Sequence, residues 1–222
     1  MGIFYFILII SLWILHLFYC LTYLHEGAGI FTIIINMILQ AYLYTGLFIT
    51  AHDAMHGTVS RNKFINNSAG RICSYLFAAI SYNKLKTNHM LHHTSPGTSS
   101  DPDFYTGSGN FLVWWLVFLR RYTSITQLII MGIIFNILKI RFTEISLFLF
   151  WILPAFISTL QLFYFGTYYP HKMPHTEEMR PHNSRSRKKN HLLAMLSCYF
   201  FGYHVEHHSS PGTPWWKLYE LK

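Results

Sequence analysis

The sequence predicts an all-α integral membrane protein with about four transmembrane helices and a histidine-rich helical cap on the cytoplasmic side. Hydrophobic residues make up 52% of the 222 residues and charged residues only 12%, about half the charged fraction of a typical soluble domain. Apolar runs long enough to cross a bilayer alternate with two long polar, basic segments, which hold most of the 14 histidines. We therefore treat residues 1–222 as a single membrane domain.

The first two spans are predicted at residues 3–24 and 30–50. Neither run holds a formally charged side chain, and each is long enough for a hydrocarbon core about 30 Å thick. A signal peptide is the alternative for the first run, but its start is not basic and the apolar stretch is longer than a signal peptide uses. The connecting residues 25–29 predict a tight turn, so the two spans are expected to form a helical hairpin.

The third and fourth spans are predicted at residues 123–140 and 145–165, and Pro154 predicts a kink in the fourth. Two weaker apolar segments precede them. Residues 64–80 could lie along the membrane interface. Residues 111–119 are too short to span and predict an interfacial helix or the approach to the third span.

The basic residues predict the orientation. Of the 17 Lys and Arg residues, seven lie within residues 51–123 and eight follow residue 166, whereas only Lys139 and Arg141 lie between the third and fourth spans. Because Lys and Arg are enriched in cytoplasmic loops, we expect both long polar segments and both termini in the cytoplasm. The basic run 185–189 is then a flanking segment that needs no binding partner.

Charge and cysteine content exclude two other classes of function. The formal charge of +8 could suggest nucleic-acid binding, but the apolar runs leave no room for a soluble basic fold, so we expect no nucleic-acid partner. Cys20, Cys73 and Cys198 are far apart and form no CxxC pair. They predict neither a disulfide framework nor a thiolate metal site.

Eight histidines form three clusters with helical spacing. His52 and His56 lie four residues apart in AHDAMHG. The clusters NHMLHH and YHVEHH hold His89, His92, His93, His204, His207 and His208. On a helix each set shares one face, so its imidazoles can converge on a metal. One such pair is usually incidental, but three sets on one predicted side of the membrane predict a shared metal site.

Two of the clusters end in nearly the same way, in HHTSPGT (92–98) and HHSSPGT (207–213). Proline disfavours helical geometry in the residue before it, and glycine accepts left-handed geometry. Each helix is therefore expected to end at its Ser-Pro-Gly, and the two similar ends predict equivalent ligands for two metal ions.

Six histidines remain outside the clusters. His171 follows the fourth span directly in FGTYYPH, which makes it a candidate ninth ligand, and His191 is a weaker candidate. We expect structural or interfacial roles for His16 and His25, and solvated positions for His175 and His182.

Carboxylates beside the clusters are expected to orient and polarise the ligands, because neutral imidazoles leave the charge of a metal ion uncompensated. The available groups are Asp53, Asp101, Asp103 and Glu206. The alternative for each is a helix cap or turn former, above all for Asp101 and Asp103 in SSDPDF.

Imidazole ligands suit iron, copper, zinc or nickel, and eight or nine of them are too many for one ion and about right for two. Zinc would support hydrolysis, and copper or iron would support oxygen activation. A transporter would place its ligands within the spans, whereas here the spans hold almost no ionisable groups. This arrangement favours an enzyme that takes a lipid-dissolved substrate from the bilayer.

The order HxxxH, HxxHH, HxxHH, divided by spans, resembles the membrane fatty-acid desaturase and hydroxylase superfamily. The strings AHDAMHG, HHTSPGTSSDPDF, FYFGTYYPH and YHVEHHSSPGTPWW resemble the bacterial-type β-carotene 4-ketolases. This similarity covers about residues 50–216, while the first two spans resemble the family only in hydropathy.

The resemblance implies a non-haem centre of two Fe²⁺ ions, O₂ as co-substrate, a ferredoxin-type electron donor and a bacterial inner membrane. The implied reaction oxidises the C4 methylene of a β-ionone ring to a ketone by two hydroxylations, taking β-carotene to echinenone and then canthaxanthin. The implied ligands are the eight cluster histidines, with His171 where the superfamily has an extra one.

Two alternatives remain open. A carotenoid ring hydroxylase or a lipid desaturase would use the same ligands, because regioselectivity depends on where the substrate carbon lies. A histidine-rich membrane metal transporter is the alternative from another class of protein. The sequence also leaves open whether hydroxylated carotenoids are accepted.

Overall fold

The computed structural model describes residues 1–24 and 28–222, and all regular secondary structure in these residues is helical. Part of the turn predicted at residues 25–29, including His25, lies outside the described residues. Two helices flank this turn, α1 (Gly2–Tyr23) and α2 (Ile30–Met55).

A third long helix runs from Glu144 to His171. It contains α7 (Glu144–Leu147), α8 (Leu153–Phe163) and α9 (Tyr169–His171), joined by π-helical segments at Phe148–Ile152 and Tyr164–Tyr168. Among the described residues, this helix, α1 and α2 are the three that are long and apolar enough to cross a membrane.

Both α2 and the third long helix continue past their predicted spans. The span predicted to end at residue 50 continues as helix to Met55, and the span predicted to end at residue 165 continues to His171. The reason is that hydropathy marks the stretch suited to lipid, whereas a helix continues for as long as tertiary packing supports it. The added turns carry His52 and His171.

The third predicted span, 123–140, corresponds to α6 (Ile125–Leu138). Fourteen residues of α-helix extend about 21 Å, which is short of a bilayer core. The preceding helix α5 (Phe111–Tyr122) meets α6 at an angle of 87°, and the two together count as a fourth span only if they form one broken span. Ser124 begins α6 with a capping box to Gln127, which sets the position of the bend.

Pro154 lies in the first turn of α8, directly after the first π-helical segment. Proline lacks the N–H that would continue the α-helical hydrogen bonds, and π-helical turns are one way in which a helix absorbs such a distortion. At the position of the predicted kink the structure therefore has a π-helical segment, and the kink itself stays a prediction.

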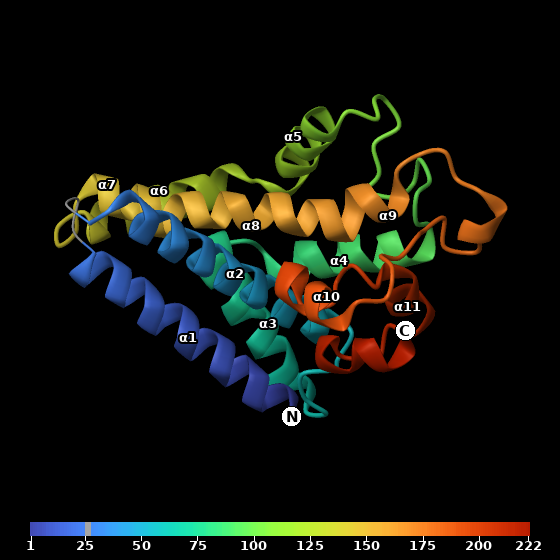
Figure 1. The fold of residues 1–222 in the computed structure, drawn as a ribbon, viewed down its shortest axis with the longest axis horizontal. Coiled ribbons are helices and arrows are strands. Elements are labelled where there is room, and N and C mark those ends of the chain that lie inside the picture. The colour runs from blue at the N-terminus through green and yellow to red at the C-terminus, as the bar shows by residue number, and fades with distance from the viewer. Residues whose placement is uncertain (25–27) are drawn as a thin grey trace.

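Shorter helices form a cap at one end of the long ones, the end where both termini lie (Figure 1). They are α3 (Lys63–Ala78), α4 (Tyr82–Thr94), α10 (His191–Cys198) and α11 (His204–Ser209), with 3₁₀ turns at Glu177–Met179 and Trp215–Leu221. Helix α3 packs on α2, and the Asn66 amide donates a hydrogen bond of 2.7 Å to the Ala54 carbonyl. Its other face exposes Phe64 and Tyr75, and the interfacial position of this helix stays a prediction.

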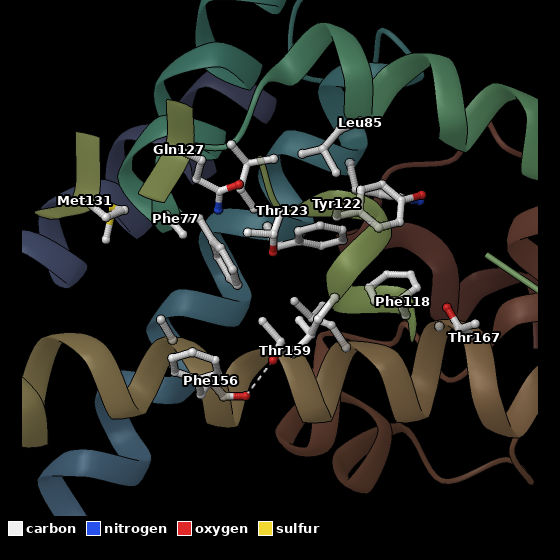
Figure 2. Close-up of a pocket in the computed structure, with 18 of the residues that line it drawn as sticks. Phe77, Leu85, Phe118, Tyr122, Thr123, Gln127, Met131, Phe156, Thr159 and Thr167 are labelled. Carbon is white, nitrogen blue, oxygen red and sulfur yellow. Dashed lines mark hydrogen bonds between the residues drawn. The ribbon is translucent and has the colours of Figure 1, made fainter. Parts of the chain in front are cut away.

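A cavity of about 470 Å³ lies between α3, the α5–α6 bend and α8 (Figure 2). Its walls are mainly apolar, with Phe77 from α3, Phe118 from α5, Met131 from α6 and Phe156 from α8. The volume lies in the range of about 300–1,000 Å³ that is usual for ligand pockets.

Candidate metal centre

Four helices bring nine histidines together in the cap. His52 lies in the last turn of α2 and His56 caps its end, while His171 is the last residue of α9. The clusters on α4 and α11 supply the other six. The histidines predicted from three separate stretches of sequence, together with His171, therefore lie in one place.

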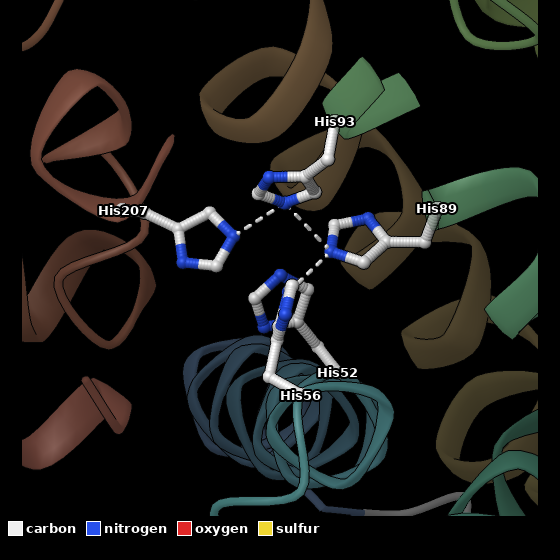
Figure 3. Close-up of side chains that lie close together, drawn as sticks. All are labelled: His52, His56, His89, His93 and His207. Carbon is white, nitrogen blue, oxygen red and sulfur yellow. Dashed lines mark hydrogen bonds between the residues drawn. The ribbon is translucent and has the colours of Figure 1, made fainter. Parts of the chain in front are cut away.

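Five of these histidines form the first cluster, namely His52, His56, His89, His93 and His207 (Figure 3). Their Nε2 atoms approach closely: 2.7 Å from His56 to His89, 3.1 Å from His89 to His93, and 2.9 Å from His93 to His207. The His52 ring centroid lies 4.5 Å from those of His89 and His207, and the buried His52 Nε2 has no hydrogen-bond partner among the described residues.

The second cluster consists of His92, His171, His204 and His208, all buried. The Nε2 of His204 lies 2.9 Å from that of His171 and 3.0 Å from that of His208, which in turn lies 3.1 Å from that of His92. The structure thus places His171, which sequence spacing alone left uncertain, among the cluster histidines.

Each adjacent histidine pair divides between the two clusters. His92 faces the second cluster and His93 the first, while His207 faces the first and His208 the second. Helices α4 and α11 end at Thr94 and Ser209, just before their Pro-Gly, as predicted. Gly97 has the expected positive φ of 68°, but among the described glycines Gly212 does not share it, so only one of the two ends uses left-handed geometry.

The donor set fits a metal ion in each cluster. Two imidazole nitrogens that bind one ion at about 2.1 Å, roughly at right angles, lie about 3 Å apart, which is the spacing observed. Convergent Nε2 atoms would repel or compete for protons without a cation, and the unpartnered His52 Nε2 points to the same group. The residues present therefore fit two metal ions.

Electrostatics keep most of these imidazoles neutral, the form that binds metal. Burial and neighbouring imidazoles lower the pKa of His93 to about 3, and burial with the charge of Lys86 lowers the pKa of His56 to about 4. Burial and neighbouring imidazoles also hold the pKa of His204 and His207 well below the usual value.

His92 differs, because two carboxylates face it. Its Nδ1 donates a hydrogen bond of 2.9 Å to Asp101 and lies 4.0 Å from Asp103. Burial lowers the pKa of His92, but the Asp101 hydrogen bond and the charges of both carboxylates outweigh burial and raise it. Asp101 also accepts from the Gly97 and Asp103 backbone N–H groups, so its carboxylate is fixed in position. The predicted orienting role fits this geometry, with turn formation as a second role of the same group.

Asp103 is held from the other side, where its carboxylate accepts a hydrogen bond from the Tyr122 hydroxyl. Burial raises the pKa of Asp103 to about 6, although the neighbouring His92 and Tyr122 lower it. Sequence analysis did not single out Tyr122, since no local pattern links it to a residue nineteen positions earlier.

The other two predicted carboxylates, Asp53 and Glu206, make different contacts from Asp101 and Asp103. Asp53 Oδ1 is 3.7 Å from His52 Nδ1, while its Oδ2 accepts a hydrogen bond of 3.2 Å from the Trp215 backbone N–H. Glu206 bonds to the Ser186 hydroxyl and, at 2.8 Å, to the Lys222 ammonium group; among the described residues it bonds to no histidine. The structure therefore brings Asp53 to the first cluster but does not bring Glu206 to either.

The remaining histidines that the structure describes lie outside both clusters. His191 bonds through Nδ1 to the Tyr203 hydroxyl at 3.2 Å, so the structure does not bring this candidate to the centre. His16 contacts Gln40 within the long helices, a structural role as expected. His175 and His182 were expected to be solvated but are half-buried in the packing around the cap, His175 donating a hydrogen bond to the His171 carbonyl.

The apolar cavity reaches both clusters. Its lining includes His52 and His89 from the first cluster and His92 and His204 from the second. One end of the cavity therefore lies against both clusters. This lining could not be identified from sequence, because its residues come from seven helices, α2, α3, α4, α5, α6, α8 and α11, and from the segments between them.

Known proteins are similar over most of the chain. A beta-carotene ketolase of Paracoccus sp. (strain N81106 / MBIC 01143) is 35% identical over 213 residues, covering 95% of this chain and 87% of that protein. A beta-carotene ketolase of Paracoccus sp. (strain PC1) is 38% identical over 180 residues, covering 80% and 74%. A zeaxanthin 4-ketolase of Chlamydomonas reinhardtii is 38% identical over 182 residues, 80% of this chain but 41% of that longer protein.

No solved structure is significantly similar to the chain. The family model described as fatty acid desaturase matches residues 27–146 and 125–222, which include all nine cluster histidines. With the ketolase relatives and the paired histidine clusters, this match shows that the chain belongs to the fatty acid desaturase family.

Proposed function

We propose that the protein is a carotenoid 4-ketolase, an oxygenase that converts the C4 methylene of a β-ionone ring to a ketone. The observation that carries this proposal is the similarity to ketolases over 80–95% of the chain. The apolar cavity that ends at both histidine clusters supports it independently, since a carotenoid needs a long apolar site with one end at the reactive centre.

The reaction consists of two successive oxidations of the same carbon. In the first, the CH₂ group, O₂, two electrons and two protons give CHOH and water. In the second, CHOH, O₂, two electrons and two protons give a geminal diol and water, and the diol loses water to leave the ketone. On β-carotene the products are echinenone and then canthaxanthin.

The proposed centre holds two iron ions, which when bound supply the O₂ activation that an allylic C–H bond requires. The first cluster would hold one ion and the second cluster the other, with all nine histidines as ligands. Asp101 would fix the ring of His92 and the position of its proton, and Asp53 would face His52.

The cavity walls would bind and align the polyene. Phe77, Phe118 and Phe156 supply flat apolar surfaces, and burial of about 25 cal/mol per Å² of apolar area makes such a site favourable for a hydrocarbon. Walls of this kind also exclude water from the reacting ring. The ring to be oxidised would lie at the end near His92 and His204.

The cap, both termini and the metal centre are proposed to face the cytoplasm of a bacterial inner membrane, with residues 1–222 acting as one domain. The distribution of Lys and Arg supports this orientation. A ferredoxin-type protein is the proposed electron donor, since two electrons from the cytoplasm are needed for each oxidation and the described residues offer no redox group besides the proposed metal centre and three buried thiols.

Expression in a β-carotene-producing bacterium, followed by pigment analysis, tests the function. We expect echinenone and canthaxanthin, and loss of both when a cluster histidine such as His93 is replaced by Ala while membrane insertion persists. Recovery of 3-hydroxylated pigments without ketones would overturn the ketolase assignment in favour of a ring hydroxylase. Purified protein with exchangeable zinc and no oxidation of any lipid would instead favour the metal transporter.

A further inference from the structure

Thr167 lies in the cavity wall at the end near the metal centre. Its side chain is buried, with 5% exposure, and lines the cavity together with Gly166 and His204. It precedes the cluster residue His171 by four positions, so the two lie one turn apart on the same side of the helix. Figure 2 shows Thr167 beside Phe118, at the opposite end of the drawn cavity from Met131.

The Thr167 hydroxyl makes no hydrogen bond among the described residues, and its oxygen is not one of the fully enclosed polar atoms that lack a partner, so it keeps some accessible surface where Thr167 lines the cavity. Threonine hydroxyls inside helices usually donate to a carbonyl in the preceding turn, as Thr45, Thr50 and Thr159 do here. Thr167 lies in the π-helical segment Tyr164–Tyr168, where Tyr169 N–H bonds to the carbonyl five residues earlier. The altered turn changes the position of the preceding carbonyls relative to the side chain, which gives a physical reason for the unused hydroxyl.

A hydroxyl that lines an apolar cavity and makes no hydrogen bond within the protein is free to bond a polar group of a ligand. An unsubstituted hydrocarbon offers no such group. The proposed reaction, however, creates a polar group in this apolar site, because the first oxidation leaves an alcohol at C4 that must stay bound for the second. The alcohol loses the hydration it would find in water, so it too needs a partner.

We infer that the Thr167 hydroxyl hydrogen-bonds the oxygen of the C4 alcohol and holds the ring in place for the second oxidation. Thr167 is thus a positioning residue that favours the ketone over release of the alcohol. The inference rests on the proposed ketolase function and deepens it. It adds no redox step, since the hydroxyl only donates or accepts a hydrogen bond.

Other polar groups of the cavity are less suited to this role. Gln127 caps α6, where its side-chain oxygen accepts a hydrogen bond from the Ser124 N–H. The Tyr122 hydroxyl donates to Asp103, and the Thr159 hydroxyl donates to the Phe156 carbonyl at 2.7 Å. The Thr123 hydroxyl has no partner among the described residues, but it lies at the α5–α6 bend, on an element that carries no cluster histidine.

Thr167→Val tests the inference, because valine keeps the shape and removes the hydroxyl. In β-carotene-producing cells we expect the ratio of C4 alcohol to ketone to rise about 2- to 10-fold, the effect of losing one neutral hydrogen bond. Purified Thr167→Val should bind the C4 alcohol more weakly by a similar factor but bind β-carotene within about twofold of the unmodified protein, which also shows that the pocket is folded. Thr167→Ser should restore the original ratio.

Two matched variants remove another hydroxyl from the same cavity, Thr159→Val and Thr123→Val. We expect each to keep the original alcohol-to-ketone ratio, whatever its total turnover. An unchanged ratio in Thr167→Val, or an equal rise in all three valine variants, would overturn the inference. If the unmodified protein makes no ketone at all, the proposed function fails instead, so the two failures are distinguishable.

Discussion

The carboxylate of Asp101 holds the ring of His92, a proposed metal ligand, and replacing this carboxylate should release metal from one cluster selectively. Asp101 Oδ2 accepts the His92 Nδ1 hydrogen bond at 2.9 Å and the Gly97 N–H at 2.8 Å. The other oxygen, Oδ1, accepts from the Asp103 N–H. In Asp101→Asn one of the two oxygens becomes an NH₂ group that donates, so at least one backbone N–H loses its acceptor, and the negative charge that makes His92 more basic is lost. The first cluster keeps all five of its histidines.

The expected size follows from losing the charged acceptor of the His92 hydrogen bond. A hydrogen bond to a charged group contributes about 1.5–3 kcal/mol, which corresponds to about 10- to 100-fold in affinity at 1.36 kcal/mol per factor of ten. Replacing the groups that orient metal ligands elsewhere reduces metal affinity by about the same factor. Iron in the second cluster should therefore become accessible to a chelator that leaves the unmodified protein loaded.

Iron content after titration with a graded series of chelators measures this effect. At a chelator strength that leaves about two irons per chain in the unmodified protein, we expect Asp101→Asn to keep about one. The iron that it keeps shows that the variant is folded. Asp103→Asn is the matched control, since its carboxylate lies 4.0 Å from His92 Nδ1 and should affect retention less. Equal retention of both irons by Asp101→Asn would refute the orienting role, and parallel loss of both would refute the division into two clusters.

Two further predictions concern packing around the centre. A methyl group on Gly166 would lie 2.1 Å from Phe201 Cε1. Gly166→Ala should therefore push the Phe201 ring toward the cavity, destabilise the protein by about 1–3 kcal/mol and lower the ketone yield. Phe201→Leu should relieve the defect, and a fully active Gly166→Ala would contradict the predicted clash. Asp53→Ala removes the acceptor of the Trp215 N–H. The free energy of unfolding should fall by about 1–3 kcal/mol, which lowers the melting temperature in detergent. An unchanged melting temperature would show that this hydrogen bond does not hold the C-terminal turn.

The cluster histidines were predictable from sequence because helical spacing is a local property. His89, His92 and His93 share a helix face whatever surrounds them. Their division between two clusters was not predictable, because it depends on how α4 and α11 face each other. The place of His171 depends in the same way on the length of the helix beyond its apolar part.

Some features of the membrane helices were likewise predictable from sequence, and others were not. The apolar runs predicted α1, α2 and α8 because apolarity over about 20 residues is an unambiguous signal. The third span was less certain, since α6 alone has 14 residues and the 87° bend at Thr123–Ser124 has no hydropathy signature. That bend shapes the cavity, and for this reason neither the cavity nor the free hydroxyl of Thr167 could be read from sequence.

The division of the adjacent histidine pairs also explains why one cavity can serve both clusters. His92 and His93 are adjacent on α4, and their ring centroids lie 5.9 Å apart. His207 and His208 are adjacent on α11, with centroids 5.8 Å apart. The spacing of adjacent residues on these two helices therefore fixes the distance between the clusters. The cavity meets His92 and His204 of one cluster and His52 and His89 of the other, while the other five cluster histidines lie outside its lining. A substrate carbon at the end of the cavity would therefore approach both clusters from the same side, and a shift of α4 would disturb both ions together. The product then depends on which ring carbon lies at that end of the cavity. Thr167, on the neighbouring wall, is placed to hydrogen-bond the oxygen that this carbon gains.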